Sequence, residues 1–395
     1  MLVSEVKAHL EQVIIPFWKN LKDKEYGGYY GYMDYNLNLD KQATKGCILN
    51  SRIMWFFSNA YEVLKEPSLL EEAKHAYHFM KVHCLDQEEG GVYWLLDYKG
   101  SPIETMKHTY NQAFAIYALS SYYKATRDKE ALRIALDLFK LIETNCKDEY
   151  GYLEAFDRHW HPIDNHKLSD DKNLLAEGKL AEKTMNTILH VLEAYTELYM
   201  VSNNLEVEKC LIDLLDMVEH KVYNPEKKQL EVFFDSKLQT IADMHSYGHD
   251  IEAAWLIDRA AMVLGNQERL KRTRDYTAQI AYKIKEVAMS KGGLNNERFN
   301  TYVDTTRIWW VQAEGVVGFI NAYQSTKDEA FLDLASQLWE YIKHNMLDLR
   351  QGSEWFWRVD ETGKPDEMAP IVEPWKCPYH NGRMCLEVIR RGIDV

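Results

Sequence analysis

The sequence lacks an excess of positive charge: 47 Lys and Arg residues stand against 61 Asp and Glu residues, which gives a net charge of −14. An acidic chain without a basic stripe is poorly suited to a polyanion, so nucleic acid is not an expected partner. No uncharged apolar run reaches the roughly 18–20 residues that a membrane span needs. Residues 1–7 (MLVSEVK) also lack the basic and apolar regions of a secretory signal.

The six cysteines are scattered, and no two of them form a CxxC pair. In a chain of 395 residues this distribution indicates reduced thiols and a cytoplasmic protein, which we expect to be a monomer or a weak homodimer. The motifs GxxxxGK[ST], GxGxxG after a strand, GxSxG and HExxH are absent. Nucleotide-dependent, hydride-transfer, serine-hydrolase and zincin chemistries therefore lose support, and we expect no cofactor and no metal.

Aromatic residues are abundant, with 11 Trp, 25 Tyr and 13 Phe. Short aromatic-rich runs recur along the chain, and a long helical pattern follows each of them. The runs begin near Gly27, Gly90, Gly151, Leu230, Gly292 and Glu354, at intervals of 63, 61, 79, 62 and 62 residues. Six units of about 62 residues thus account for nearly the whole chain. The longer interval is explained by an insertion with loop composition at residues 166–178.

Each unit contains two predicted helices of different character. One is amphipathic, as in residues 128–147, where the apolar side chains recur at the spacing of one buried stripe: Leu132, Ala135, Leu136, Phe139 and Ile142. The other is apolar almost all round, as in residues 48–64, so it must be surrounded by protein. The twelve expected helices are Leu2–Leu21, Lys45–Lys65, Ser68–Cys84, Lys107–Ala125, Asp128–Cys146, Leu180–Val201, Leu205–Val222, Tyr247–Leu264, Gln267–Val287, Thr305–Tyr323, Lys327–Met346 and Tyr379–Ile389.

Six such pairs predict an (α/α)6 barrel, an all-α fold in which the apolar helices form an inner ring inside the amphipathic ones. The aromatic runs are expected to form short β-hairpins or loops at one mouth, which the first turns of the inner helices would line. An open solenoid and two three-unit domains are the alternatives. No linker rich in Pro, Gly or Ser lies near the middle, and a closed ring needs no caps, so we expect one domain over residues 1–395.

Polar side chains on the inner helices are costly to bury unless they are paired, so they are the candidate functional residues. Arg52 precedes a strongly apolar stretch and needs an anionic or oxygen-rich partner; a structural ion pair is the alternative reading. His249 and Glu252 share a helix face, with Trp255 one turn further along. We expect Glu252 to orient or charge the His249 imidazole. A single His-x-x-Glu pair does not complete a di-metal site.

Two further clusters have a composition that suits a sugar. Trp309, Trp310 and Glu314 combine aromatic platforms with an acceptor for hydroxyl groups, although tryptophans in the core with a structural glutamate would give the same pattern. Trp375 and His380 lie on either side of a proline that suits the entry of a helix. His380 is therefore expected in the first turn of that helix, at the mouth.

Amides and a phenol on two other inner helices are candidates for substrate positioning. Tyr110, Asn111 and Gln112 follow one another, and Asn186 and His190 are four residues apart on one face. Side chains of these types more often position a substrate than react with it.

The two histidines at the mouth favour one reaction class over another. Imidazole has a pKa close to neutral pH, so His249 and His380 suit the removal and return of a proton. Paired carboxylates about 5–9.5 Å apart would suit glycoside hydrolysis instead. The barrel hosts both chemistries, so the fold does not decide between them. The position of the histidines favours isomerisation.

At these residues the chain resembles the N-acylglucosamine 2-epimerase superfamily. The likeness runs from end to end and is carried by IIPFWKNLKDKEYGGYYGY, KGCILNSRIMWFFSNAY, YGHDIEAAW, RIWWVQAEG and KCPYHNGRM. It implies reversible epimerisation at C2 of the reducing-end glucose of a β-1,4-linked disaccharide, from cellobiose to glucosyl-mannose and from lactose to epilactose. An N-acylglucosamine 2-epimerase, an aldose–ketose isomerase, an inverting glycoside hydrolase and a non-enzymatic sugar-binding barrel remain alternatives.

The resemblance also implies a role for each site residue. Proton transfer falls to His249 and His380, with Glu252 tuning His249, and Arg52 would stabilise the oxyanion of an enediolate intermediate. Substrate binding falls to the others: His190 and Asn186 would hold the C1 oxygen and its neighbours, Trp310 and Trp375 would stack on the sugar rings, and Glu314 and Tyr110 would bind hydroxyl groups. Trp255 and Trp309 are also expected to bind the substrate.

Overall fold

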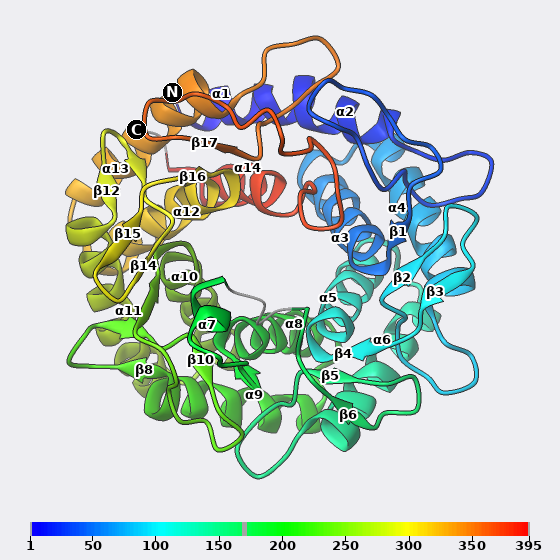
Figure 1. The fold of residues 1–395 in the computed structure, drawn as a ribbon, viewed down its shortest axis with the longest axis horizontal. Helices are drawn as coiled ribbons and strands as arrows, with labels where there is room; N and C mark the ends of the chain where they lie inside the picture. Colours follow the sequence, from blue (N-terminus) through cyan, green and yellow to red (C-terminus); the bar gives the residue numbers. More distant parts are fainter. Residues whose placement is uncertain (1, 168–171, 394–395) are drawn as a thin grey trace.

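The computed structural model describes residues 2–167 and 172–393. Two concentric rings of helices surround one axis (Figure 1). The inner helices are α3 (Cys47–Leu64), α5 (Thr109–Thr126), α8 (Met185–Ser202), α10 (Tyr247–Leu264), α12 (Trp309–Thr326) and α14 (His380–Arg391). Each inner helix packs on the next, and α14 packs on α3, so the ring is closed. The predicted (α/α)6 barrel is confirmed, and an open solenoid is excluded.

The outer ring covers the inner one with amphipathic helices. Its members are α1 (Leu2–His9) with α2 (Ile15–Asn20), α4 (Pro67–Phe79), α6 (Lys129–Leu141), α9 (Leu205–Met217), α11 (Gln267–Val287) and α13 (Ala330–Tyr341). Turns of π-helix interrupt or end five of them, at Leu10–Ile14, Met80–Cys84, Ile142–Cys146, Val218–Val222 and Ile342–Met346. In α6 the buried stripe is centred on Ile134 and Leu138, and Leu132 and Leu136 are only half-buried. None of the described helices combines the length and the hydropathy of a membrane span.

Short antiparallel strands connect neighbouring units at the mouth, where Figure 1 shows them in front of the helices. The strand before an inner helix pairs with the aromatic run of the next unit: β1 with β2, β4 with β5, β7 with β10, β11 with β14 and β16 with β17. The strands are β1 Lys45–Gly46, β2 Leu95–Leu96, β3 Pro102–Glu104, β4 Lys107–His108, β5 Ala155–Phe156, β6 Pro162–Ile163, β7 Lys183–Thr184, β8 Tyr223–Asn224, β9 Gln229–Leu230, β10 Phe233–Phe234, β11 Met244–Ser246, β12 Met289–Ser290, β13 Gly293–Leu294, β14 Glu297–Phe299, β15 Tyr302–Asp304, β16 Arg307–Ile308 and β17 Arg358–Val359.

The structure corrects several predicted helix limits. Predicted starts at Lys107, Leu180 and Thr305 are too early, because strands β4, β7 and β16 keep the backbone extended until α5, α8 and α12 begin. The first predicted helix is interrupted by a π-turn before Pro16, which lacks the N–H that a regular helix needs there. The predicted insertion at 166–178 contains a short helix, α7 (Lys172–Ala176), and its residues 168–171 lie outside the described part of the chain.

A buried basic residue stands two positions before five of the six inner helices: Lys45, Lys107, Lys183, His245 and Arg307. The three lysines bind aspartates that stand three or four residues before an aromatic run, in the pairs Lys45–Asp23 at 2.6 Å, Lys107–Asp86 at 2.9 Å and Lys183–Asp148 at 2.6 Å. At the sixth unit, buried Lys376 binds buried Glu354. A charge buried this fully is tolerated only beside its partner, so these pairs hold the mouth strands and loops in place.

We expect Lys45→Met to lower the free energy of unfolding by about 3 kcal/mol, because the Asp23 carboxylate loses its buried partner. The loss is at the low end for a buried pair because the backbone N–H groups of Glu25 and Tyr26 still donate to Asp23. Lys45→Met/Asp23→Asn should be less destabilised than Lys45→Met alone. Urea denaturation of both variants measures the difference, and equal losses would contradict a stabilising pair.

Candidate active site

A pocket of about 360 Å³ opens at the mouth of the barrel, where the first turns of the inner helices meet the strands before them. Every predicted site residue lines it except Asn111, Gln112, Trp255 and Glu314. The lining residues that were predicted are Arg52, Tyr110, Asn186, His190, His249, Glu252, Trp309, Trp310, Trp375 and His380. Those that sequence reasoning missed are Lys167, Thr184, Val232, Phe233, Met244, Ser246 and Glu297.

Trp255 and Glu314 are fully buried behind the pocket wall. The indole Nε1 of Trp255 donates to Glu314 Oε2 at 3.0 Å, so this ring offers no face to a sugar. Glu314 Oε1 lies 2.8 Å from Nδ1 of His380. The sequence predicts that Glu314 binds substrate hydroxyl groups. In the structure its carboxylate holds the imidazole of His380, which lines the pocket.

Both candidate catalytic histidines are held through Nδ1. The partner of His380 is Glu314, and His249 Nδ1 lies 2.7 Å from the hydroxyl of Ser246. Among the described residues, none binds Nε2 of either ring, which leaves that nitrogen for a ligand. The predicted pairing of Glu252 with His249 is not made, because the guanidinium of Arg383 binds Glu252.

One indole ring contacts both histidines. The ring centre of Trp310 lies 4.7 Å from that of His249 and 5.3 Å from that of His380. Burial lowers the pKa of His249 to about 3, and burial together with nearby Arg383 lowers the pKa of His380 well below its usual value. Both rings are therefore neutral near pH 7, and a neutral imidazole nitrogen can accept a proton.

Arg383 is the centre of the buried network behind the pocket. Its side chain is 1% exposed, and it binds Glu193 Oε1 at 2.5 Å, Glu314 Oε1 at 2.6 Å and the carboxylate of Glu252. Glu193 in turn lies 2.9 Å from Nδ1 of His190. One guanidinium thus fixes the carboxylates that orient two histidines of the pocket. Arg383 belongs to the motif KCPYHNGRM. Its position along the helix does not by itself predict a functional residue.

The carboxyl groups around Arg383 differ in protonation. Burial raises the pKa of Glu252 to about 8, with a further contribution from nearby Glu314, against the opposing effect of Arg383. For Glu193, burial raises the pKa, but Arg383 and His190 outweigh it and hold the value at about 2. At neutral pH the network therefore keeps a proton on Glu252 while Glu193 is ionised.

The same cluster has the spacing of a metal site. Glu252, Glu314 and His380 place one ligand atom each within 4.8 Å of one another. The guanidinium of Arg383 already binds both carboxylates and supplies the positive charge that a metal would bring. The arrangement fits the positioning of a histidine better than metal coordination, and we assign no metal to it.

Arg52 is surrounded by aromatic rings and hydroxyl or thiol groups. Its Nη2 donates to Tyr110 Oη at 2.7 Å, and its guanidinium lies 4.2 Å from the ring centre of Phe114 and 4.9 Å from that of Tyr379. Burial raises the pKa of Tyr110 to about 12, so the phenol stays protonated. Within the described chain no carboxylate lies within 4.0 Å of Arg52, so the alternative of a structural ion pair is not met. Its charge is available to the pocket.

Several pocket side chains carry buried polar atoms that make no hydrogen bond with any described residue. These atoms are Arg52 Nε, Asn186 Oδ1, Glu252 Oε2 and Trp309 Nε1. Buried polar groups are rarely left without partners, so these pocket side chains are candidates for polar contacts with a ligand. Trp375, whose ring centre lies 5.9 Å from that of Tyr110, adds an aromatic wall.

Two predicted positioning residues are structural instead. The Gln112 amide accepts from Val92 N at 2.6 Å and donates to Val92 O at 2.8 Å. Asn111 Nδ2 donates to Tyr93 O at 2.8 Å. Both amides therefore tie α5 to the preceding aromatic run.

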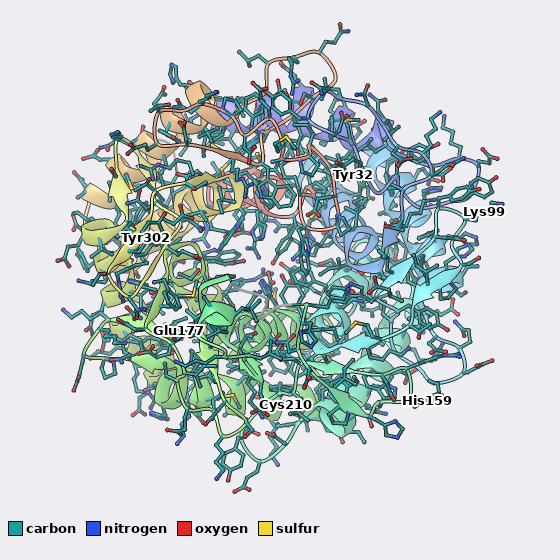
Figure 2. All side chains as sticks on the ribbon, viewed as in Figure 1. Tyr32, Lys99, His159, Glu177, Cys210 and Tyr302 are labelled. Atoms are coloured by element: carbon teal, nitrogen blue, oxygen red, sulfur yellow. The ribbon has the colours of Figure 1, made fainter. Side chains whose placement is uncertain are left out.

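The insertion contributes to the pocket, whereas the hairpin before it does not. Lys167 lines the pocket, forms an ion pair of 2.7 Å with Glu104 and lies 5.6 Å from the ring centre of Trp94. Figure 2 shows His159 at the outer edge of the molecule, far from the barrel axis. We assign no role to that histidine.

Known proteins match this chain over its whole length. The sequence model of the family described as N-acylglucosamine 2-epimerase (GlcNAc 2-epimerase) matches residues 27–381. The chain is 53% identical over 395 residues to cellobiose 2-epimerase of Ruminococcus albus, covering 100% of both chains. It is 47% identical over 391 residues to cellobiose 2-epimerase of Dictyoglomus turgidum, covering 99% of both. The structure of cellobiose 2-epimerase from Bacillus thermoamylovorans is similar, with a TM-score of 0.95 at 46% identity over 99% of both chains.

The chain therefore belongs to the N-acylglucosamine 2-epimerase family, as its sequence motifs predict. It is an epimerase, an enzyme of the isomerase class. Within the family, the relatives it resembles at high identity are cellobiose 2-epimerases.

The raised pKa of Glu252 has a measurable effect on stability. The folded protein keeps a proton that the unfolded chain releases, so stability should fall as the pH rises from about 5 to about 8. One such group contributes a slope of up to about 1.4 kcal/mol per pH unit. We expect Glu252→Gln to lack this contribution. Urea denaturation at several pH values compares the two proteins, and parallel pH profiles would contradict the raised pKa.

Proposed function

We propose that the enzyme interconverts C2 epimers at the reducing end of β-1,4-linked disaccharides, with cellobiose and lactose as substrates. One observation carries the proposal. Two neutral histidines, His249 and His380, contact the same Trp310 ring in a pocket that also contains Arg52. The high identity to enzymes named cellobiose 2-epimerase supports the disaccharide as substrate class.

The reaction begins with the open-chain sugar, whose C1 carbonyl acidifies the proton at C2. One histidine removes this proton through Nε2, since Nδ1 is held by Glu314 or Ser246. The Arg52 guanidinium and the Tyr110 hydroxyl donate hydrogen bonds to the enediolate oxygens as negative charge develops there. The other histidine then returns a proton to the opposite face of C2.

Two neutral histidines alone hold no proton to return, so the network must provide one. Glu252 keeps a proton at neutral pH, and its Oε1 lies 4.0 Å from Nδ1 of His380. A proton moving from this carboxyl group protonates His380, which then acts as the acid while His249 acts as the base. In the reverse direction the roles exchange. One forward turnover leaves the C2 proton on His249 and Glu252 ionised, and exchange with solvent returns both groups to their starting protonation before the next turnover.

The pocket wall accounts for sugar recognition. Trp309, Trp310 and Trp375 present flat apolar faces to the C–H groups of the rings, while their neighbours bind hydroxyl groups. Asn186 Oδ1 is one such acceptor, and the Nε1 group of Trp309 is a donor. His190, fixed by Glu193, binds the oxygens next to C2.

A glycoside hydrolase fits the site less well. Its two carboxyl groups must face the scissile bond, with room for water in the inverting enzymes. Glu252 and Glu314 instead lie within 4.8 Å of each other, and Glu314 does not reach the pocket. The guanidinium of Arg383 binds both side chains and holds them next to each other, not on opposite sides of a substrate.

Incubation of the enzyme with cellobiose or lactose in D₂O, followed by NMR, tests the substrate and the reaction together. We expect deuterium at C2 of the reducing-end sugar and a manno-configured product, with the glycosidic bond intact. N-acetylglucosamine and mannose serve as comparison substrates and should react more slowly. Released glucose, or preferential reaction of a monosaccharide, would contradict the proposal.

His249→Ala and His380→Ala should each reduce kcat by about 10²–10⁴-fold, because each removes one of two required proton carriers. His220→Ala, on the outer ring, is the matched control and should retain activity. Circular dichroism checks that each variant is folded. Activity near the wild-type level in either pocket variant would refute the two-histidine mechanism.

A further inference from the structure

A second cavity lies at the end of the barrel opposite the mouth. It has a volume of about 640 Å³ and is lined by the final parts of α5, α8, α10, α12 and α14, together with α11. The inner helices all begin at the mouth, so their length separates this cavity from the active site. On α14, for example, His380 is the first residue and Arg391 the last, about 16 Å apart at 1.5 Å per residue.

The cavity is strongly cationic, although the chain as a whole has a net charge of −14. Six basic side chains line it against a single carboxylate, Glu387. The basic residues are Lys124, Arg259, Arg274, Lys327, Arg390 and Arg391. A concave wall with one sign of charge concentrates small ions of the opposite sign.

Local acidic groups compensate only part of this charge. Asp258 interacts electrostatically with Arg274 and Arg391, but burial raises its pKa. Two carboxylates, Glu197 and Glu387, are each shared by two of the basic side chains. The contacts are Arg259–Glu197 at 2.5 Å, Lys124–Glu197 at 3.6 Å, Arg390–Glu387 at 3.1 Å and Arg391–Glu387 at 3.4 Å. These contacts hold the cations in fixed positions and leave an excess of positive charge around the cavity.

The two remaining cations have weaker neighbours. Arg274 Nη2 lies 3.5 Å from the sulfur of Met262, and its buried Nε makes no hydrogen bond with the described residues. Lys327 Nζ lies 5.7 Å from the ring centre of Tyr323. A thioether and a ring face are poor substitutes for an anion. Burial also lowers the pKa of Arg391, and nearby Glu387 opposes this effect only in part.

Cations near helix C-termini also stabilise the helix dipole, but that role does not explain this cluster. The ends of α10, α12 and α14 are closed by backbone N–H groups of Gly265, Lys327 and Gly392. The guanidinium groups bind side chains: Arg391 Nη1, for example, donates to Asn321 Oδ1 at 3.1 Å. They therefore line the cavity and do not cap the terminal carbonyls.

We propose that this cavity is a binding site for a small phosphate-bearing anion with two or more negative charges. Guanidinium groups bind phosphate oxygens through paired, charge-assisted hydrogen bonds, and several of them converge here. The overall negative charge of the chain disfavours a nucleic acid or another long polyanion. A ligand bound here contacts α10, α12 and α14, the helices that carry His249, Trp310 and His380 at the mouth.

Isothermal titration calorimetry with inorganic pyrophosphate, at constant ionic strength, tests the site without depending on catalysis. We expect one saturable site per chain in the wild type. In Arg274→Gln/Lys327→Gln the affinity should fall at least about tenfold, because two of the converging charges are lost. Neither residue has a carboxylate within 4.0 Å in the described structure, so the substitutions leave no acid unpaired and the variant should fold.

The matched control is Lys74→Gln/Arg133→Gln, which removes two exposed charges from the outer ring. Unchanged affinity in the control, with the loss confined to the cavity variant, supports the site. The proposal is overturned if the wild type shows no saturable binding up to about 10 mM. It is also overturned if both double variants bind equally well, since the interaction would then reflect general charge.

Discussion

The barrel depends on burying a positive charge at the entrance of its inner helices. Lys45, Lys107 and Lys183 are fully buried, and each meets an aspartate of a mouth loop. Because a buried ammonium group without its partner is strongly unfavourable, a loop that moved away would destabilise the helix behind it. These ion pairs therefore hold the loops before the aromatic runs against the starts of the inner helices that carry pocket residues.

Arg383, which lies behind the pocket wall, is a second buried charge that needs ionic partners. Three carboxylates converge on one guanidinium, and two of them hold histidines of the pocket. The positions of these rings are thus set by an ion network that the substrate never touches. This explains why so many polar groups are tolerated on helices that have no face toward solvent.

The fold could be predicted from the sequence because a 62-residue period and two kinds of helix determine it. The site could be predicted only in part. Buried polar residues on inner helices identified the lining, but spacing along one helix gave the wrong partner for His249 and misplaced Glu314 and Trp255. Glu314 with His380, and Glu252 with Arg383, are contacts between different units, and nothing local in the sequence encodes such distances. Arg383 was missed for the same reason. The partner of His249 is the nearby Ser246, whose short, uncharged hydroxyl side chain is not indicated by the pattern of charged residues.

The strands at the mouth pair each unit with the next, and the first unit closes on the last through Met33 and Val372. The first helix, α1, and the last, α14, consequently pack against each other (Figure 1). No pairing along the ring depends on the chain starting where it does. A circularly permuted chain, cut in an outer loop between two units and joined across the present ends, would preserve every neighbour relation. The six units therefore form a closed cycle, in which the first and last units are neighbours like any other pair.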